Sequence, residues 1–225
     1  MFFIVQKHSL KLLKNKLYKK SFILRKFILM YNIVMKKSVL IFIILLGLQN
    51  IVFAAENNQV KEDGVLLYSM NKVNEAKEVF EQIPQDSRDA ETWLLLSNIA
   101  QDLQDEGHVE VYLRYAINKD PKYYKAYYNL GIINFNKGNI DEAIDNFKTA
   151  LKYNKKNSYI LTNLGCCYLA KKNLAIAKFY FNKAITLNSQ NPTNYYNLAY
   201  IYKQKGNEKK AQELIDIYNK LMQER

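Results

Sequence analysis

The sequence contains few of the residues that reactive sites and irregular structures need. Its 225 residues include two Cys, two His, three Pro and seven Gly. Two Cys exclude a disulfide framework and a four-Cys zinc site. His108 is the single His after residue 55, which leaves little for histidine-based catalysis. The scarcity of Gly and Pro argues against a long disordered tract and against a turn-rich all-β domain.

Acidic residues are absent from the N-terminal segment. Residues 1–55 hold ten Lys or Arg and no Asp or Glu, whereas residues 56–225 hold 23 basic and 21 acidic residues. Most of the formal net charge of +12 therefore belongs to the N-terminal segment. The remaining 170 residues are nearly balanced in charge, and they are enough for one domain with a sizeable core.

Residues 35–55 have the pattern of a secretory signal peptide. Met35-Lys36-Lys37 precede an apolar run from Val39 to Phe53, and Ala54-Ala55 follow it. A short positive start, an apolar stretch and small residues at the end characterise such peptides. We favour cleavage after Ala54 over an uncleaved signal anchor, because the run is short for a membrane span.

Export follows from either alternative, because basic residues in front of an apolar run keep that end of the chain in the cytoplasm. We expect an exported protein, periplasmic or secreted, or one anchored in the inner membrane if residues 38–54 are not cleaved. Residues 1–34 alternate Lys-rich and apolar pieces. They indicate either an amphipathic membrane-surface helix or a start codon assigned upstream of Met35. We favour the second interpretation, since Met35 begins a complete signal peptide by itself.

The rest of the chain repeats with a period of 34 residues. Asn-Leu-Gly at residues 129–131 recurs at 163–165 and, as Asn-Leu-Ala, at 197–199. The other positions in phase are Ala143, Ala177 and Ala211, then Leu113, Phe147, Phe181 and Ile215, then Ala116, Ala150 and Ala184. A 34-residue period with a small residue after Leu, then Ala, an aromatic residue and Ala, resembles the tetratricopeptide repeat (TPR). The resemblance implies an all-α, right-handed α-solenoid of helix-turn-helix units.

The period delimits five units after the N-terminal segment, at residues 57–89, 90–123, 124–157, 158–191 and 192–225. Each unit has the pattern of two amphipathic helices joined by a turn such as Lys137-Gly138-Asn139. Small residues such as Gly131 indicate a close helix crossing, with aromatic residues opposite. The second unit lacks Gly in its turn and has Gly107 three residues later, so we expect a longer first helix or a shifted turn there.

The resemblance also implies that the first helix of each unit lines a concave groove. Asn129, Asn163 and Asn197 form a row at unit spacing, and a side-chain amide both donates and accepts hydrogen bonds. The resemblance implies that they hold the backbone of a bound peptide; the alternative is that each bonds within its own repeat. Neighbouring Tyr side chains offer contact area for recognition. The candidate peptide-binding residues are Asn129, Asn163, Asn197, Lys125, Tyr128, Ile132, Tyr159, Tyr196 and Tyr200. Phe135, Thr162, Cys166, Leu169 and Lys203 are their neighbours in the groove.

No motif indicates catalysis, and we expect no enzyme activity, cofactor or metal. Cys166 and Cys167 are adjacent, so they point about 100° apart on a helix and are interpreted as small packing residues. His108 is interpreted as a solvated loop residue.

The sequence favours a protein-binding scaffold of the cell envelope with an unidentified protein or peptide partner, and membrane contact through the N-terminal segment alone. The alternative is a self-assembling structural protein that forms a homodimer through its C-terminal repeat. An RNA-binding helical repeat is less favoured, because the charge of residues 56–225 is a poor match for nucleic acid.

Overall fold

The computed structural model describes the backbone of residues 2–224 and the side chains of residues 26, 29–32 and 34–224. The chain divides into two compact units, Met1–Gln59 and Val60–Arg225. Most side chains on which the interpretation of residues 1–34 depends lie outside the described residues.

The first unit consists of the N-terminal part of helix α1 (Phe2–Ser69). Between Leu29 and Ser69 this helix is long and apolar enough to cross a membrane by length and composition, and none of its most apolar window is buried. A signal sequence near an N-terminus has the same two properties, so the segment is compatible with both alternatives for residues 35–55.

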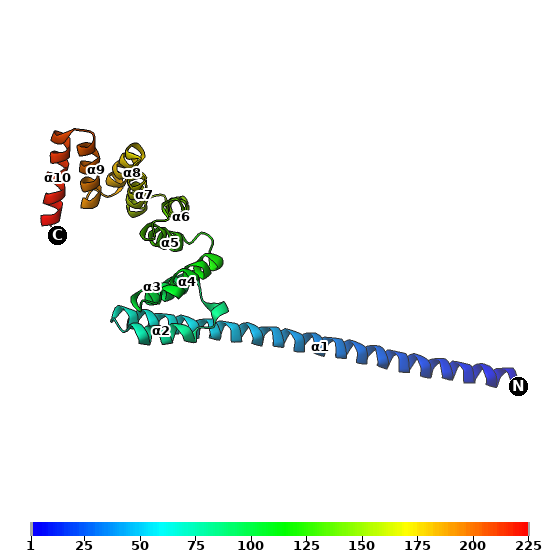
Figure 1. Cartoon of the computed structure of the whole chain (residues 1–225). Helices are drawn as coiled ribbons and strands as arrows, with labels where there is room; N and C mark the ends of the chain where they lie inside the picture. The colour runs from blue at the N-terminus through cyan, green and yellow to red at the C-terminus, as the bar shows by residue number, and fades with distance from the viewer. Residues whose placement is uncertain (1, 225) are drawn as a thin grey trace. The chain divides into compact units, whose positions relative to one another are not determined.

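The second unit is a series of helix pairs. Its first pair is formed by the last ten residues of α1 and by α2 (Val73–Gln82), and the single-turn helix η1 (Gln85–Ser87) leads to the next pair. The remaining helices are α3 (Ala90–Asp102), α4 (Glu106–Lys119), α5 (Tyr124–Asn136), α6 (Ile140–Tyr153), α7 (Ser158–Ala170), α8 (Leu174–Leu187), α9 (Pro192–Gln204) and α10 (Glu208–Gln223). Residues 2–224 contain no strand. Consecutive pairs stack on one another (Figure 1), so the predicted all-α solenoid is confirmed.

The two helices of each pair cross at a residue too close to its partner for a larger side chain. A Cβ atom placed on Gly131 would lie 2.6 Å from Cε1 of Phe147, and one on Gly165 would lie 2.5 Å from Cε1 of Phe181. Gly64 lies equally close to Phe80, at 2.8 Å from Cζ. In each pair the ring lies 16 residues after the glycine and is buried. The ring occupies the volume that a side chain on the first helix would otherwise fill.

The two remaining pairs keep the spacing and exchange volume across it. Where the first helix carries Ser97 in place of Gly, the second carries Leu113, and Ala199 is likewise matched by Ile215. Ser97 is buried, and its hydroxyl donates to the Val109 carbonyl oxygen at 2.9 Å. A larger residue on one helix is thus accompanied by a smaller one on the other, as close packing requires.

The turn between paired helices contains one residue in the left-handed conformation. These residues are Asn71, Gln104, Gly138, Lys172 and Gly206, with φ between 57° and 80°. The last four are 34 residues apart, and the backbone amides of residues 171–173 make the same hydrogen bonds as those of residues 137–139. The expectation for the second unit is therefore wrong: α3 has 13 residues, as do α5 and α7, and Gln104 takes the conformation at the usual place. Gly107 lies inside α4.

Salt bridges and a helix cap link the first pair to the second. Lys61 Nζ lies 2.9 Å from Asp89 and 2.6 Å from Glu91. Asp89 also caps α3, because its carboxylate accepts from the backbone N–H of Thr92 at 2.7 Å. Burial opposes the charged form of Asp89, but the bonds from Lys61 and Thr92 outweigh it and hold the pKa of that carboxyl below its ordinary value.

We expect Gly131→Ala to destabilise the array by about 1–2 kcal/mol, because overpacking outweighs the helix propensity gained. The same change in a Phe147→Leu background should be close to neutral, since that pair copies the small-residue and Leu pairing of Ser97 and Leu113. Denaturant titration of the four members of this cycle measures the coupling. Additive effects of the two substitutions would contradict the proposed volume exchange.

We expect Lys172→Gly to stabilise the array by about 0.5–1 kcal/mol, because glycine relieves the strain of a left-handed L-residue and part of that gain is lost to chain entropy. Lys205→Gly is the matched control: it lies one residue before the equivalent place, at φ −94°, and should destabilise. Gly138→Ala should also destabilise, although a Cβ there would meet nothing within 4 Å. Thermal unfolding of the three variants tests the signs.

Candidate functional site

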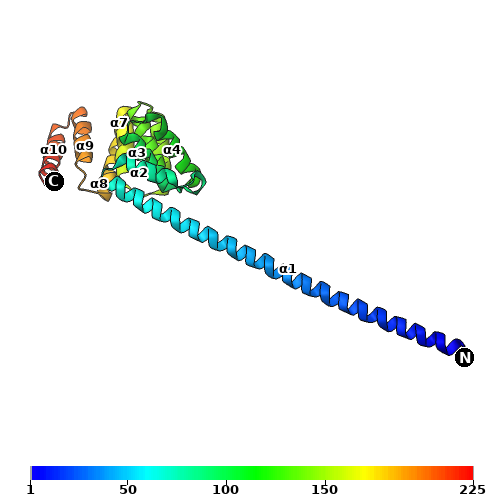
Figure 2. The same ribbon diagram turned by 90° about the horizontal axis from the view of Figure 1, so that it is seen from below.

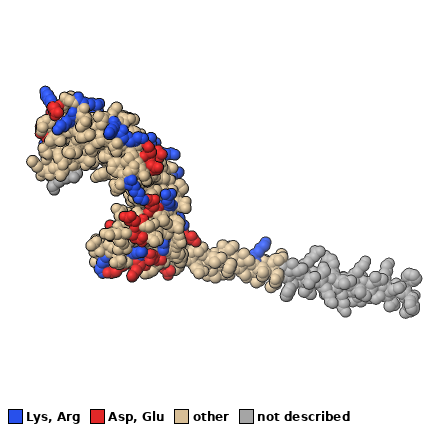
Figure 3. All heavy atoms as spheres, in the orientation of Figure 1, with Lys and Arg blue, Asp and Glu red and all other residues tan. Residues whose placement is uncertain are grey.

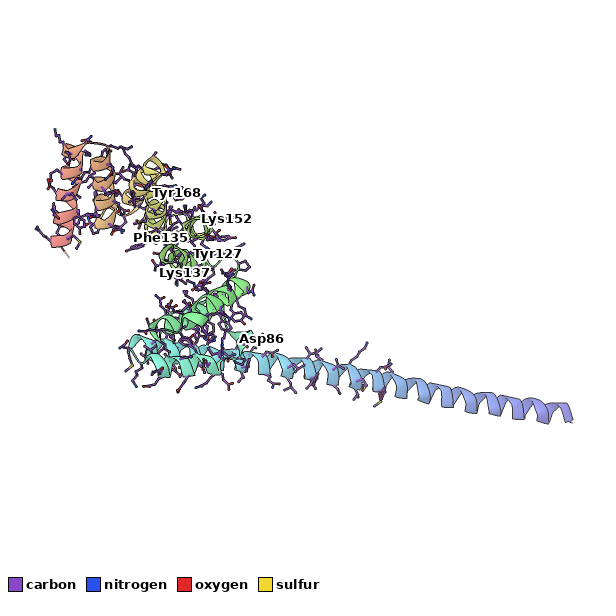
Figure 4. The ribbon with its side chains drawn as sticks, in the orientation of Figure 1. Asp86, Tyr127, Phe135, Lys137, Lys152 and Tyr168 are labelled. Carbon is purple, nitrogen blue, oxygen red and sulfur yellow. The ribbon has the colours of Figure 1, made fainter. Side chains whose placement is uncertain are left out.

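The first helices of the third, fourth and fifth units form one surface, here called the first-helix face. An open hollow of about 500 Å³ lies on it between α5, α7 and α9. Its lining residues are Phe135, Cys166, Leu169, Ala170, Tyr196, Asn197 and Tyr200. Phe135, labelled in Figure 4, supplies the α5 side of the hollow. The lining is apolar and aromatic, with the Asn197 amide and the two Tyr hydroxyl groups as its polar atoms, which suits peptide recognition.

Three of the candidate residues meet at this hollow, namely Tyr196, Asn197 and Tyr200. Tyr196 is 53% exposed and Tyr200 48% exposed. Large aromatic side chains left this accessible on a helix are characteristic of recognition surfaces. Tyr196 also approaches Tyr218 of α10, with ring centroids 5.4 Å apart.

The asparagine row makes contacts between units. Asn163 Nδ2 donates to the Tyr128 hydroxyl of the preceding unit at 3.2 Å. Asn197 Nδ2 donates to Cys166 Sγ, also in the preceding unit, at the long distance of 3.9 Å. Neither bond lies within one repeat, and the carbonyl oxygens of both amides keep their capacity to accept. Asn129 is partly buried in α5.

The remaining candidates lie along the same helices but away from the hollow. Lys125 and Tyr159 hold equal places near the beginnings of α5 and α7, and both are exposed. Tyr128 and Ile132 are partly buried and pack against the core, Tyr128 with its ring centroid 5.8 Å from that of Phe147. Thr162 is buried between α7 and α9, where its hydroxyl bonds to Asn194 Oδ1 at 2.9 Å.

Ala170 is the lining residue that the sequence interpretation missed. It ends α7 beside Leu169, and its small size leaves the hollow open on that side. The signal was available in the period, because Ala170 precedes the turn residues Lys171 and Lys172 just as Asn136 precedes Lys137 and Gly138.

Both cysteines have the properties of packing residues. Cys167 is fully buried and Cys166 partly buried, and neither is in a disulfide. Burial raises the pKa of the Cys166 thiol to about 11 and that of the Cys167 thiol to about 12. Each is therefore a neutral thiol near pH 7 and a weak nucleophile.

The histidine expectation requires one correction. His108 lies in the first turn of α4, and not in a loop, because the helix begins at Glu106. Its Nδ1 is 2.8 Å from Asp105, and its ring stacks on Tyr112 with centroids 5.4 Å apart. In the part of the chain that the structure describes, no three His, Cys, Asp or Glu side chains are grouped so that they could hold a metal ion.

The fold and the first-helix face define the class as a helical-hairpin solenoid of the kind that binds other proteins. Tetratricopeptide-repeat family models match residues 124–157, 158–191 and 180–213. The chain is therefore a tetratricopeptide-repeat protein, and such repeats serve protein–protein interaction.

A curated relative and two solved structures show the same repeat architecture. The Photosystem I assembly protein Ycf3 of Rippkaea orientalis is 31% identical over 109 residues, 44% of this chain. The chain spans 63% of the length of that relative. PilF of Pseudomonas aeruginosa superposes with a TM-score of 0.66 at 20% identity, covering 73% of this chain and 75% of PilF. MamA of Desulfovibrio magneticus RS-1 (residues 41 to the end) gives 0.65 at 14% identity, covering 75% and 96%. Likeness at these identities shows the fold.

We expect the two thiols of the folded protein to react about 100-fold more slowly at pH 8 than in denaturant, because a pKa raised by two units removes that fraction of thiolate. A chromogenic disulfide reagent with and without denaturant measures both rates. The folded-state rate should rise about tenfold for each pH unit up to pH 10, as thiolate forms. Equal rates in the two conditions would show that the thiols are activated and not merely packed.

Proposed function

We propose that this TPR-repeat protein is a non-catalytic scaffold that binds an extended peptide segment of a partner protein on the first-helix face. The observation that carries the proposal is the hollow between α5, α7 and α9, because three successive units contribute to one apolar, aromatic surface. A segment that crosses it meets each unit in turn.

The chemistry of the lining supports a peptide as the ligand. Tyr196 and Tyr200 present ring faces and hydroxyl groups, so they can cover apolar side chains and still bond to backbone groups. Asn197 retains a carbonyl oxygen that can accept from a peptide N–H. Asn163 and Asn129 continue the row towards the third unit, although Asn163 must share its amide with Tyr128.

The place of action is part of the proposal. The signal-like residues 35–55 and the apolar helix segment Leu29–Ser69 support export of the repeats into the cell envelope, with or without retention of an anchor. The relative named as an assembly protein supports a role in which the scaffold holds a partner during assembly. The identity of the partner is a matter for capture experiments.

A second candidate function is self-assembly through the last pair of helices. A hollow of about 300 Å³ lies between α9 and α10, which run side by side in Figure 2. Its lining includes Tyr200, Ala211 and Ile215, and Ile217 of α10 is exposed. Because this hollow shares Tyr196 and Tyr200 with the first one, the two functions compete for the same side chains.

A photo-cross-linking residue in place of Tyr200 should capture the partner in the native envelope, because position 200 borders both hollows. The same residue in place of Tyr153, at the end of α6, is the matched control and should capture little. Adding Asn197→Ala and Tyr196→Ala should reduce capture at a neighbouring probe at least about tenfold, as truncation of central aromatic contacts does. Helicity should not change.

The adducts separate the two candidate functions. Adducts to another protein that depend on Tyr196 support the scaffold, whereas adducts to a second copy of this chain contradict it and support self-assembly. In that case Ile217→Glu should reduce the mass measured by light scattering. Point changes serve better than truncation from residue 214, because Leu214 is buried in the core. Equal capture from positions 153 and 200 would contradict both.

A further inference from the structure

Charge is strongly segregated along the repeats, although their total is close to zero. Residues 56–145 hold 17 acidic and nine basic residues, whereas residues 146–225 hold four acidic and 14 basic residues. Between Asn146 and Asn207 there are ten Lys and no Asp or Glu. Figure 3 shows acidic side chains gathered around the helices that begin the array and basic side chains along its later helices. The later half therefore presents a positive surface.

Most of this positive charge is not neutralised within the protein. Among the described residues, Lys171 is the one lysine of the 146–207 segment with a carboxylate partner, Asp141, at 2.5 Å. Lys178 instead lies over the Tyr202 ring at 4.5 Å, and Lys183 lies 5.9 Å from the Phe179 ring centroid. An external anion could approach these ammonium groups without competing with an internal one.

The exposed side of α8 is apolar at the centre of this positive segment. Phe179 is 59% exposed and Leu187 43% exposed, and Ile176 is also exposed. Ile176, Phe179, Lys183 and Leu187 are spaced by three and four residues, which places them along one side of the helix. They are called the α8 outer face below.

The repeat itself does not require apolar residues at these places. At the positions equivalent to Ile176 and Phe179, α6 carries Glu142 and Asp145, and α10 carries Lys210 and Glu213. Since the same packing tolerates charges in the units on both sides, the α8 outer face is not explained by the core. It also shares no residue with the hollow on the first-helix face.

We propose that the α8 outer face is a membrane-contact surface that takes anionic phospholipid. Exposed Phe, Ile and Leu flanked by Lys, with no carboxylate on the same helix, is the composition of helices that lie at a lipid interface. Each Lys near an anionic surface contributes about 1 kcal/mol of attraction. Three separated apolar side chains are few for a protein interface, which covers about 800 Å² on each partner. This contact is additional to the N-terminal segment, through which alone the sequence predicts membrane contact.

Brominated lipids test the contact without interference from the N-terminal helix. The full-length Phe179→Trp variant is reconstituted into vesicles of equal parts phosphatidylcholine and phosphatidylglycerol, with acyl chains brominated near the headgroup. We expect emission from the indole introduced at position 179 to fall about twofold relative to unbrominated vesicles, because an interfacial aromatic residue reaches this depth. Trp93 is buried, so the unsubstituted protein supplies its background. Vesicles of phosphatidylcholine alone should give no quenching.

The Val111→Trp variant is the matched control, because Val111 is exposed on α4 at the place equivalent to Phe179 but in the acidic half. Its emission should not be quenched in either vesicle. A further variant carries Leu187→Trp together with Ile176→Glu and Phe179→Asp, the residues that α6 has at these places, so the fold should persist. The indole at position 187 should then lose the quenching that it shows when Leu187→Trp is the sole change.

The proposal is overturned if the Phe179→Trp variant is not quenched in anionic vesicles, which is also the result expected for a surface that binds an acidic protein. It is overturned as well if the Val111→Trp variant is quenched equally, or if quenching is the same without phosphatidylglycerol. Circular dichroism establishes that each variant is helical.

Discussion

The structure depends on the close crossing of the two helices within each unit. A small residue on the first helix and a large one 16 residues later must together fill one volume, as Gly131 does with Phe147 and Ala199 with Ile215. This sum fixes how near the helices lie, and the spacing of 16 fixes the length of helix and turn between them. Gln104 and Lys172 accept a left-handed conformation because the crossing on either side leaves the turn no alternative.

The crossing constrains one side of each helix and leaves the others free. Positions that face the partner helix hold Ala or an aromatic residue in nearly every unit, whereas outward positions differ widely between α6, α8 and α10. In a solenoid each unit contacts its neighbours alone, so variation on an outward side does not disturb distant units. Binding properties can therefore change from unit to unit on a common backbone, as the contrast between Asp145 and Phe179 shows.

The period made the fold predictable from sequence, since Gly131, Phe147 and their equivalents recur in phase. The length of α3 was not, because a missing Gly was given more weight than the spacing from Ser97 to Leu113. Of the candidate site, the meeting of Tyr196, Asn197 and Tyr200 followed from the period. The bond from Asn163 to Tyr128 did not, because it depends on side-chain rotamers across two units. Net charge concealed the segregation of acidic and basic residues, because a total carries no positions.

The segregation gives the two proposed surfaces different physical characters. The hollow on the first-helix face is aromatic and mostly uncharged, so salt should affect occupation of that surface little. The α8 outer face combines few apolar contacts with many unpaired ammonium groups, so its attraction is long-ranged, weak for each contact and screened by salt. Because the surfaces share no residue, a partner bound in the hollow leaves the Lys side chains of α8 uncovered. A scaffold built in this way can hold a protein segment and rest on a lipid surface at the same time.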